Sequence, residues 1–270
     1  MKRYGKWALV TGATSGIGRA LTQQLAAAGL NVVIVSRTQS RLDTLAEVLR
    51  AEHGVQVRVI PMDLSIRQGV DDLIDQVDVE IDVLVPCAAM ETRGYFVDSS
   101  AETHRRVLDM DCYGPMRLSH HFGQNMALRG RGAILLVSSL SGWTGQPYMA
   151  HYGAVKAYIL SLGEGLHQEM KDKGVDVTVL SPGPTDTGMA PKINAELVKL
   201  GMVVMSPDIV AATGLKALGR QPNAVPGFRN KMMLVMMTRM MPRAWVGAIS
   251  RWMMARVVKI RGRLEAAEAA

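Results

Sequence analysis

The sequence predicts an α/β domain built on a doubly wound parallel sheet. Short apolar runs rich in Val, Ile and Leu alternate with helical patterns over the first 185 residues, and a glycine-rich turn follows the first run. Runs that are apolar at successive positions are typical of strands covered by helices on both faces. Repeated strand–helix–strand units make the strands parallel, because each helix returns the chain to the edge where the previous strand began.

Seven strands are expected, each of them short. The first six lie at 7–10, 31–36, 56–61, 82–86, 132–138 and 175–181. Helical patterns separate them at about 17–28, 39–53, 66–77, 101–128 and 153–173. A helix at about 207–218 leads to a last strand at 223–228. We expect residues 1–228 to form a single domain and residues 229–270 to add a helical extension.

Charge is unevenly distributed along the chain. The formal net charge is +7, yet residues 1–208 carry 20 basic and 22 acidic groups, while residues 209–264 carry eleven Lys or Arg and no acid. Because the excess belongs to one segment, the sequence does not indicate a nucleic-acid-binding domain. No run of about 18 apolar residues predicts a membrane span, and the start lacks the apolar core of a signal peptide. Cys87 and Cys112 have no metal-ligand spacing, so we expect buried thiols in a cytoplasmic protein without a metal.

The stretch TGATSGIG, residues 11–18, lies where the first strand turns into a helix. Gly12 allows a sharp turn, Gly16 lets the backbone approach a phosphate, and Gly18 permits close packing of the helix on the sheet. The N–H groups and positive dipole end of the helix favour an anion. In this context the turn predicts binding of a dinucleotide pyrophosphate. The expected contacts are Gly12, Thr14, Ser15, Gly16, Ile17 and Gly18.

The stretch SSLSGWTGQPYMAHYGAVKA, residues 138–157, places Lys156 four residues after Tyr152 and Ser139 thirteen residues before that tyrosine. Residues i and i+4 of a helix share one face, so the phenol and the ammonium would lie side by side. An ammonium favours the phenolate and lowers a pKa that starts near ~10. A tyrosine of that kind can exchange protons near neutral pH. The pair alone is also common on surface helices.

The ordered set of motifs resembles the short-chain dehydrogenase/reductase family, of the compact, Rossmann-like kind. The resemblance covers about residues 5–228 and adds Asp63-Leu64 and PGPTDT at 182–187 to the motifs above. It implies that Tyr152 is the general acid/base, that Lys156 lowers its pKa and holds the nicotinamide ribose, and that Ser139 orients the substrate oxygen. Further cofactor contacts that it implies are Asp63, Leu64, Ala88, Tyr152, Lys156, Pro182, Gly183, Thr185 and Thr187.

The end of the second strand indicates which nicotinamide cofactor is used. Members that prefer NAD place an acid there for the ribose 2′-OH. Here Ser36 takes that place, Arg37 follows it, and Arg41 lies a turn later. A guanidinium matches phosphate oxygens bidentately, so the sequence favours NADP(H). The alternative, an arginine that only begins a helix, would place a cation at the positive end of the helix dipole.

Two positions depart from the family pattern. The usual Asn-Asn-Ala-Gly after the fourth strand reads PCAA at 86–89, and Asp111 replaces the Asn that holds a water on the lysine. An Asp accepts the same hydrogen bonds but cannot donate while it is ionised. We include Asp111 among the catalytic residues as an altered relay position. Loss of catalysis, leaving a dinucleotide-binding protein, is the alternative.

Apolar residues indicate the kind of substrate. Trp143, Tyr148 and Met149 lie in the segment that lines the substrate cleft of this family, and residues 188–205 would form a flap rich in methionine. We therefore expect an NADP(H)-dependent oxidoreductase that interconverts a ketone or aldehyde and an alcohol on a hydrophobic substrate, with 3-oxoacyl thioester reduction as the main alternative. Family members of this kind imply a homodimer or homotetramer.

The C-terminal extension combines methionines, tryptophans and positive charge. Residues 229–263 hold nine Lys or Arg, and a helical stripe is expected from Val246, Ile249, Met253, Val257 and Ile260. One interpretation is a peripheral anchor on an anionic membrane surface or a flexible wall of the substrate entrance. The other is a pair of helices packed on the domain or on a second subunit.

Overall fold

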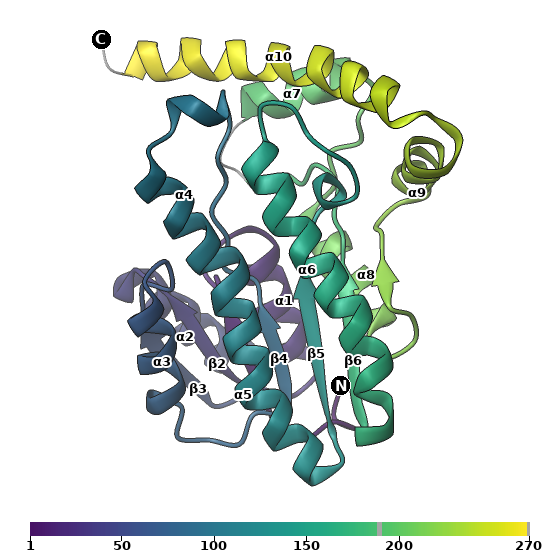
Figure 1. The fold of residues 1–270 in the computed structure, drawn as a ribbon. Coiled ribbons are helices and arrows are strands. Elements are labelled where there is room, and N and C mark those ends of the chain that lie inside the picture. The colour runs from purple at the N-terminus through teal and green to yellow at the C-terminus, as the bar shows by residue number, and fades with distance from the viewer. Residues whose placement is uncertain (188–190, 269–270) are drawn as a thin grey trace.

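The computed structural model describes residues 1–187 and 191–268, with the backbone alone for 191–193 and 260–268. A seven-stranded sheet with the order β3-β2-β1-β4-β5-β6-β7 runs through the molecule, and every paired strand is parallel to its neighbour. Helices cover both faces of this sheet (Figure 1). The predicted fold class is confirmed.

The observed elements match the predicted ones closely in the first part of the chain. The strands are β1 Trp7–Thr11, β2 Asn31–Ser36, β3 Val57–Pro61, β4 Val83–Pro86, β5 Gly132–Val137, β6 Val175–Leu180 and β7 Asn223–Ala224. The helices are α1 Gly16–Ala27, α2 Gln39–His53, α3 Arg67–Gln76, α4 Ala101–Leu108, α5 Gly114–Arg129, α6 Ala150–Glu169, α7 Pro191–Lys199, α8 Pro207–Ala217, α9 Phe228–Val235 and α10 Arg243–Glu268.

Two predicted elements are wrong in extent. The last strand has only two residues, because Pro226 lacks a ladder N–H and Gly227 has a φ of 81°. The single helix predicted over 101–128 is divided into α4 and α5 by a π-helical turn, Asp109–Tyr113. Such turns insert a residue into the helical repeat and often lie at functional sites. This one carries Asp111.

The sheet separates two buried clusters. Along β2, Val32 and Ile34 pack in one cluster and Val33 and Val35 in the other, because successive side chains of a strand point to opposite faces. Helices α1, α2 and α8 contribute to the first cluster, and α3, α5 and α6 to the second. The chain reverses its direction of winding between β1 and β4, which places a crevice at the carboxyl ends of these strands.

The C-terminal extension lies across this end of the sheet. After α9 and a second π-helical turn, Met236–Met240, helix α10 runs over α7 (Figure 1). Val257 of α10 and Leu197 of α7 are buried together, and Met254 packs beside them. Of the predicted stripe, Val246 and Val257 are buried, but Ile249 is 45% exposed because the packed face is rotated away from it. The side chain of Ile260 lies outside the described residues. Within the described residues, none of the helices has the length and hydropathy that a membrane span needs.

Candidate active site

Ser139, Tyr152 and Lys156 come together beyond the carboxyl end of β5. Ser139 precedes a short 3₁₀ turn, Leu140–Gly142, that packs on α6, the helix that carries the other two residues. The neighbouring Ser138 Oγ donates to the Lys156 carbonyl oxygen at 2.7 Å, which fixes the turn on the helix. The Ser139 side chain is near enough to Tyr152 to lower the pKa of its phenol, and Lys156 Nζ lies 5.6 Å from the centre of the Tyr152 ring. The three side chains are close enough together for the roles that the family resemblance implies. Those roles stay a prediction.

The pKa of Tyr152 differs from the expectation. Burial raises it, and the carboxylates of Glu91 and Asp111 add to this, so the opposing charge of Lys156 and the Ser139 hydrogen bond do not bring it below its ordinary value. Burial lowers the pKa of Lys156, but the charges of Asp111 and Tyr152 outweigh burial and raise it overall. The ammonium therefore stays charged, while the phenol holds its proton at neutral pH.

Asp111 contacts Lys156 directly. Its Oδ1 lies 2.8 Å from Lys156 Nζ, and both side chains are almost completely buried. Its Oδ2 accepts the Met90 N–H at 2.8 Å. Burial raises the pKa of Asp111, whereas Lys156 and the Met90 N–H oppose that rise. The π-helical turn thus places a carboxylate against the ammonium, and the same carboxylate holds the chain after β4, where the family pattern is altered.

The glycine-rich turn lies between two other segments of the crevice. Gly12 has a φ of 66°, and a Cβ there would lie 2.9 Å from the Ala88 Cα. Gly16 has a φ of 51°, and a Cβ there would lie 2.8 Å from the Thr187 Cγ2. Ser15 precedes α1 without a side-chain cap, and the first turn of α1 has no acid. The first N–H groups of this helix are therefore available to a pyrophosphate. Thr14, Ile17 and Gly18 lie in the same turn.

The carboxyl ends of β2 and β3 fit a nucleotide that carries an extra phosphate. The buried Ser36 Oγ has no hydrogen-bond partner among the described residues. Arg37 is exposed, and its charge acts on Asp63. Burial alone would raise the pKa of Asp63, but hydrogen bonds from Ser65 and the charge of Arg106 outweigh it and lower that pKa overall. An unpaired hydroxyl and a free guanidinium thus lie beside an ionised carboxylate.

One of the predicted nucleotide contacts, Leu64, has other surroundings than expected. Leu64 is only 5% exposed and packs in the core, so little of its side chain can contact an adenine ring. Arg41 is exposed on α2, one turn after Arg37. The contact of Leu64 with the base stays a prediction that depends on its backbone and the small exposed part of its side chain.

The 182–187 segment is held by the 3₁₀ turn that follows Ser139, and it lies against the extension. The Leu140 N–H donates to the Pro182 carbonyl oxygen at 2.9 Å, and the Thr185 hydroxyl donates to the Gly183 carbonyl oxygen at 3.0 Å. Asn230 of α9 is 3% exposed, and a Cβ on Gly183 would lie 2.9 Å from its Nδ2. Asn230 was not predicted as a site residue. Its one signal was a short amide side chain among apolar and basic residues.

Aromatic side chains form an exposed rim beside the catalytic residues. The Tyr148 carbonyl oxygen accepts the Gly94 N–H at 2.9 Å, and the Tyr95 and Tyr148 rings meet edge to face with their centres 5.1 Å apart. Hydrogen bonds with Tyr95 and with Arg251 of α10 lower the pKa of Tyr148. Of the three residues expected to line the cleft, Tyr148 lies on this rim, whereas Trp143 packs on the core and Met149 is buried.

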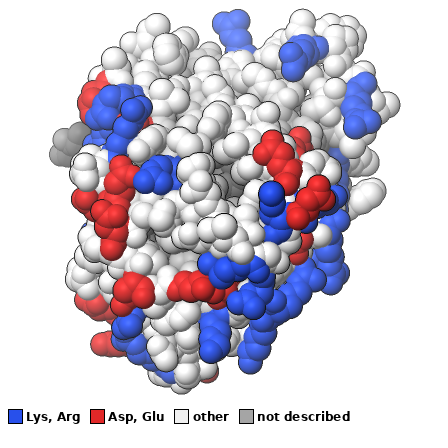
Figure 2. All heavy atoms as spheres, turned by 60° about the horizontal axis from the view of Figure 1, so that its bottom comes forward, with Lys and Arg blue, Asp and Glu red and all other residues white. Residues whose placement is uncertain are grey.

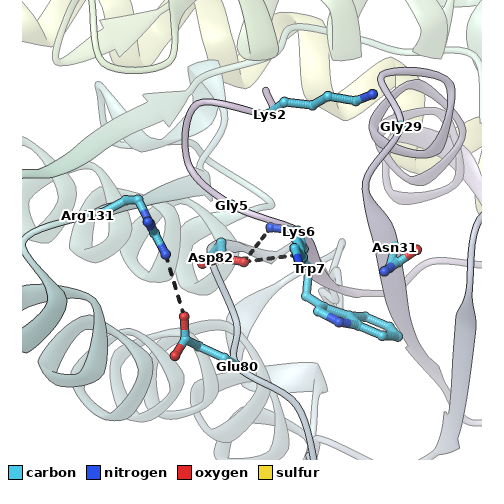
Figure 3. Close-up of a pocket in the computed structure, with 9 residues that line it drawn as sticks. All are labelled: Lys2, Gly5, Lys6, Trp7, Gly29, Asn31, Glu80, Asp82 and Arg131. Atoms are coloured by element: carbon cyan, nitrogen blue, oxygen red, sulfur yellow. Dashed lines mark hydrogen bonds and ion pairs between the residues drawn. The ribbon is translucent and has the colours of Figure 1, made fainter.

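A hollow of the described chain lies elsewhere, away from these residues. It has a volume of about 720 Å³ and lies at the amino ends of β1, β2 and β5 (Figure 3). Its central carboxylate, Asp82 Oδ2, accepts the Lys6 and Trp7 N–H groups at 2.7 and 3.0 Å. Because the strands are parallel, the catalytic residues lie at the opposite edge of the sheet. Asp82 therefore anchors the start of β1.

The two cysteines are free thiols. Burial raises the pKa of Cys87 to about 11, although the charge of Lys156 opposes this, and burial raises the pKa of Cys112 to about 12. Both thiols are therefore protonated at neutral pH and poor nucleophiles.

Comparisons with known proteins agree with this fold. Residues 6–198 match the short chain dehydrogenase family. The chain is 32% identical over 231 residues to a 7beta-hydroxysteroid dehydrogenase of Clostridium sardiniense, covering 85% of this chain and 88% of the relative. It is 34% identical over 188 residues to a very-long-chain 3-oxoacyl-CoA reductase of Pyricularia oryzae, covering 66% of this chain and 56% of the relative.

Solved structures show the same likeness. A structure from a study of 7beta-hydroxysteroid dehydrogenase stereoselectivity superimposes with a TM-score of 0.85 at 28% identity, covering 93% of this chain and 98% of that one. A short-chain dehydrogenase of Sphingobium yanoikuyae in complex with NADPH gives a TM-score of 0.75 at 29% identity, covering 84% and 90%.

The fold, the family match and the relatives define an oxidoreductase that binds a nicotinamide cofactor and acts on CH–OH groups. The chain belongs to the short-chain dehydrogenase/reductase family. The predicted family and enzyme class are confirmed.

Proposed function

We propose that this protein is an NADP(H)-dependent oxidoreductase that interconverts a bulky, apolar ketone and its alcohol. The observation that carries the proposal is the meeting of Ser139, Tyr152 and Lys156 beside a rim of exposed aromatic side chains. When bound, the nicotinamide supplies the hydride. The protein holds and orients the substrate and exchanges one proton at its oxygen.

Each catalytic residue has a separate task in this proposal. The Tyr152 hydroxyl gives its proton to the carbonyl oxygen in reduction and takes it back in oxidation. The Ser139 hydroxyl donates a hydrogen bond to the same oxygen and orients it. Lys156 holds a positive charge beside the phenol and the ribose, and Asp111 fixes the position of that charge.

The preference for NADP(H) rests on the end of β2. Ser36 leaves room where an acid would repel a 2′-phosphate, and Arg37 is exposed beside it with no carboxylate paired to it in the described part of the chain. The NADPH complex of the related Sphingobium enzyme supports this choice. Because Arg37 acts electrostatically on Asp63, both residues face the space that the adenosine half would fill.

The size and polarity of the substrate rest on the rim and on the relatives. Tyr95 and Phe96 are exposed next to Tyr148, and apolar surface of this kind favours an apolar ligand. The relatives named above are a hydroxysteroid dehydrogenase and a very-long-chain 3-oxoacyl-CoA reductase. We place a steroid-like ketone first, because that relative is matched over most of both chains, and a 3-oxoacyl thioester second. Family resemblance supports a homodimer or homotetramer in the cytoplasm.

The test is a substrate panel with purified protein. Steroid ketones, simple bulky ketones and 3-oxoacyl thioesters are each offered with NADPH and with NADH, and products are identified by mass. The proposal expects turnover of a bulky ketone with NADPH, with kcat/KM at least ten-fold higher than with NADH. Turnover confined to thioesters would select the second substrate class. Binding of NADPH without turnover of any carbonyl or of the corresponding alcohols would support the catalytically silent protein instead.

A further inference from the structure

Helix α10 has one packed face and one uncovered apolar face. Val246 and Val257 are buried, with exposures of 2% and 0%. On the other side, Trp245, Ile249 and Trp252 follow one another at helical spacings of four and three, and they are 65%, 45% and 56% exposed. Two of the four tryptophans of the chain therefore lie on solvent-facing positions of a single helix.

The preceding helix repeats this pattern. On α9 and the π-helical turn after it, exposed side chains follow one another at spacings of four, three, one and four residues, which places them on one broad face. These side chains are Phe228 at 79%, Met232 at 58%, Val235 at 49%, Met236 at 46% and Met240 at 75% exposed. Two consecutive helices that each leave an apolar stripe uncovered mark an interaction surface.

The positive charge of the same segment indicates a negatively charged partner. Residues 209–264 contain no Asp or Glu, and residues 229–263 contain nine Lys or Arg. None of those between 229 and 259 pairs with a carboxylate of the described chain, and the Arg256 guanidinium lies 4.2 Å from the centre of the Trp252 ring. By contrast, the opposite end of the molecule mixes acids and bases closely (Figure 2).

We propose that α9 and α10 dock on an anionic lipid surface, with Trp245 and Trp252 at the interface and the surrounding Lys and Arg on the headgroups. Amphipathic helices with tryptophan on the apolar face and cations around it bind at this depth of a bilayer. A second copy of the chain fits less well, because a two-fold contact through this surface would bring like charges together without an acid to pair them. The docked surface lies at the end of the molecule where α10 runs over α7 (Figure 1).

The experiment is co-sedimentation of the full-length protein with vesicles. Vesicles of pure phosphatidylcholine are compared with vesicles that contain phosphatidylglycerol, each at about 50 and about 500 mM salt, where the Debye length changes from over 10 Å to less than half of that. The proposal expects at least ten-fold tighter binding to the anionic vesicles at low salt, release at high salt, and a blue shift of tryptophan emission. The assay needs no substrate, so its outcome is independent of the proposed function.

Matched variants distinguish binding through this surface from non-specific adsorption to vesicles. Trp245→Ser with Trp252→Ser removes only exposed side chains, so the fold is retained, and vesicle binding should fall at least ten-fold. Leu128→Ser is the control, because Leu128 is 87% exposed on α5 at the other end of the molecule. Arg243→Gln with Arg256→Gln should reduce binding, whereas Lys216→Gln, on the exposed face of α8, should not.

Three results would overturn the proposal. One is the absence of binding to anionic vesicles, and another is binding that ignores both lipid charge and salt. The third is a stable oligomer that the double tryptophan variant dissociates, measured by light scattering without lipid, which would assign the surface to a second copy.

Discussion

Replacing Asp111 by Asn should shift the pH dependence of catalysis to lower pH. The carboxylate lies 2.8 Å from Lys156 Nζ, which lies 5.6 Å from the centre of the Tyr152 ring, so the negative charge is at most 8.4 Å from that centre. At an effective dielectric constant of ~20, a unit charge at that distance contributes ~2 kcal/mol. Because Tyr152 is partly exposed, solvent screens part of this interaction, and we keep about half to all of its energy. That energy corresponds to a shift of about one unit in the pKa of Tyr152. Removing the charge therefore lowers the pKa of Tyr152.

The assay is kcat/KM for carbonyl reduction from pH 6 to pH 10. Reduction needs the protonated phenol, so activity falls as the pH rises through the pKa of Tyr152, and Asp111→Asn should move this fall about one unit lower. The variant should fold and keep most of its turnover at its optimum. It should lose about 1–3 kcal/mol of stability, because Asn has one acceptor oxygen for the two donors that Asp111 now satisfies.

Asp109→Asn is the matched control for this variant. Asp109 is also buried on the π-helical turn, but it pairs with Arg67 and Arg105 and does not contact Lys156. It should lower stability without moving the pH profile. Equal profiles for the two variants, or a shift of the Asp111 variant to higher pH, would refute the electrostatic reasoning.

Three further predictions test the cofactor site, the extension and the thiols. Arg37→Ala should weaken NADPH binding by about 1.5–3 kcal/mol, because a charge-assisted contact to the 2′-phosphate is lost, and should leave NADH binding almost unchanged. A fluorescence titration measures both affinities, and an equal effect on the two cofactors would show that Arg37 does not bind the 2′-phosphate. Asn230→Ala should lower the free energy of unfolding by about 1–3 kcal/mol, because the Pro226 carbonyl loses its hydrogen-bond donor. It should also raise KM for the cofactor, because the side chain that lies beside Gly183 is removed. An unchanged KM would show that α9 does not influence cofactor binding. Cys87, whose pKa burial raises to about 11, should react with iodoacetamide at pH 8 far more slowly than after denaturation, and equal rates would show that this thiol is not shielded.

Local patterns were sufficient for the sheet and for most of the crevice. The apolar runs of β1 to β6 are continuous, so their positions depend little on the rest of the molecule. Gly12, Gly16 and the Tyr152–Lys156 pair could be placed because each requires a conformation or spacing that the sequence itself carries. The order of these motifs along the chain then indicated which segments meet at the carboxyl edge.

What the sequence could not predict depends on contacts between distant segments. The π-helical turn at Asp111 places a carboxylate on Lys156, 45 residues further along the chain, and a period of 3.6 residues over 101–128 conceals the inserted residue. The direction in which the pKa of Tyr152 shifts depends on burial, which the spacing of residues in the sequence does not indicate. Asn230 lies beside Gly183 only because α9 packs there, which the local sequence does not indicate.

The predicted stripe of α10 failed in part for a similar reason. Periodicity identifies an apolar helix but not the direction in which that helix is rotated on its neighbours. Ile249 was placed with Val246 and Val257, yet it lies with Trp245 on the uncovered face. A helix with two apolar faces is consistent with a second partner, which is the basis of the lipid proposal.

The most direct test of the central claim compares the wild type with Tyr152→Phe in NADPH oxidation with a bulky apolar ketone. NADPH binding, followed by fluorescence, serves as the control for folding in both proteins. The account predicts that both bind NADPH and that the wild type turns over, while the variant loses at least a hundred-fold in kcat because the carbonyl oxygen has no proton donor. Equal turnover by the two proteins, or equal inactivity despite NADPH binding, would contradict it.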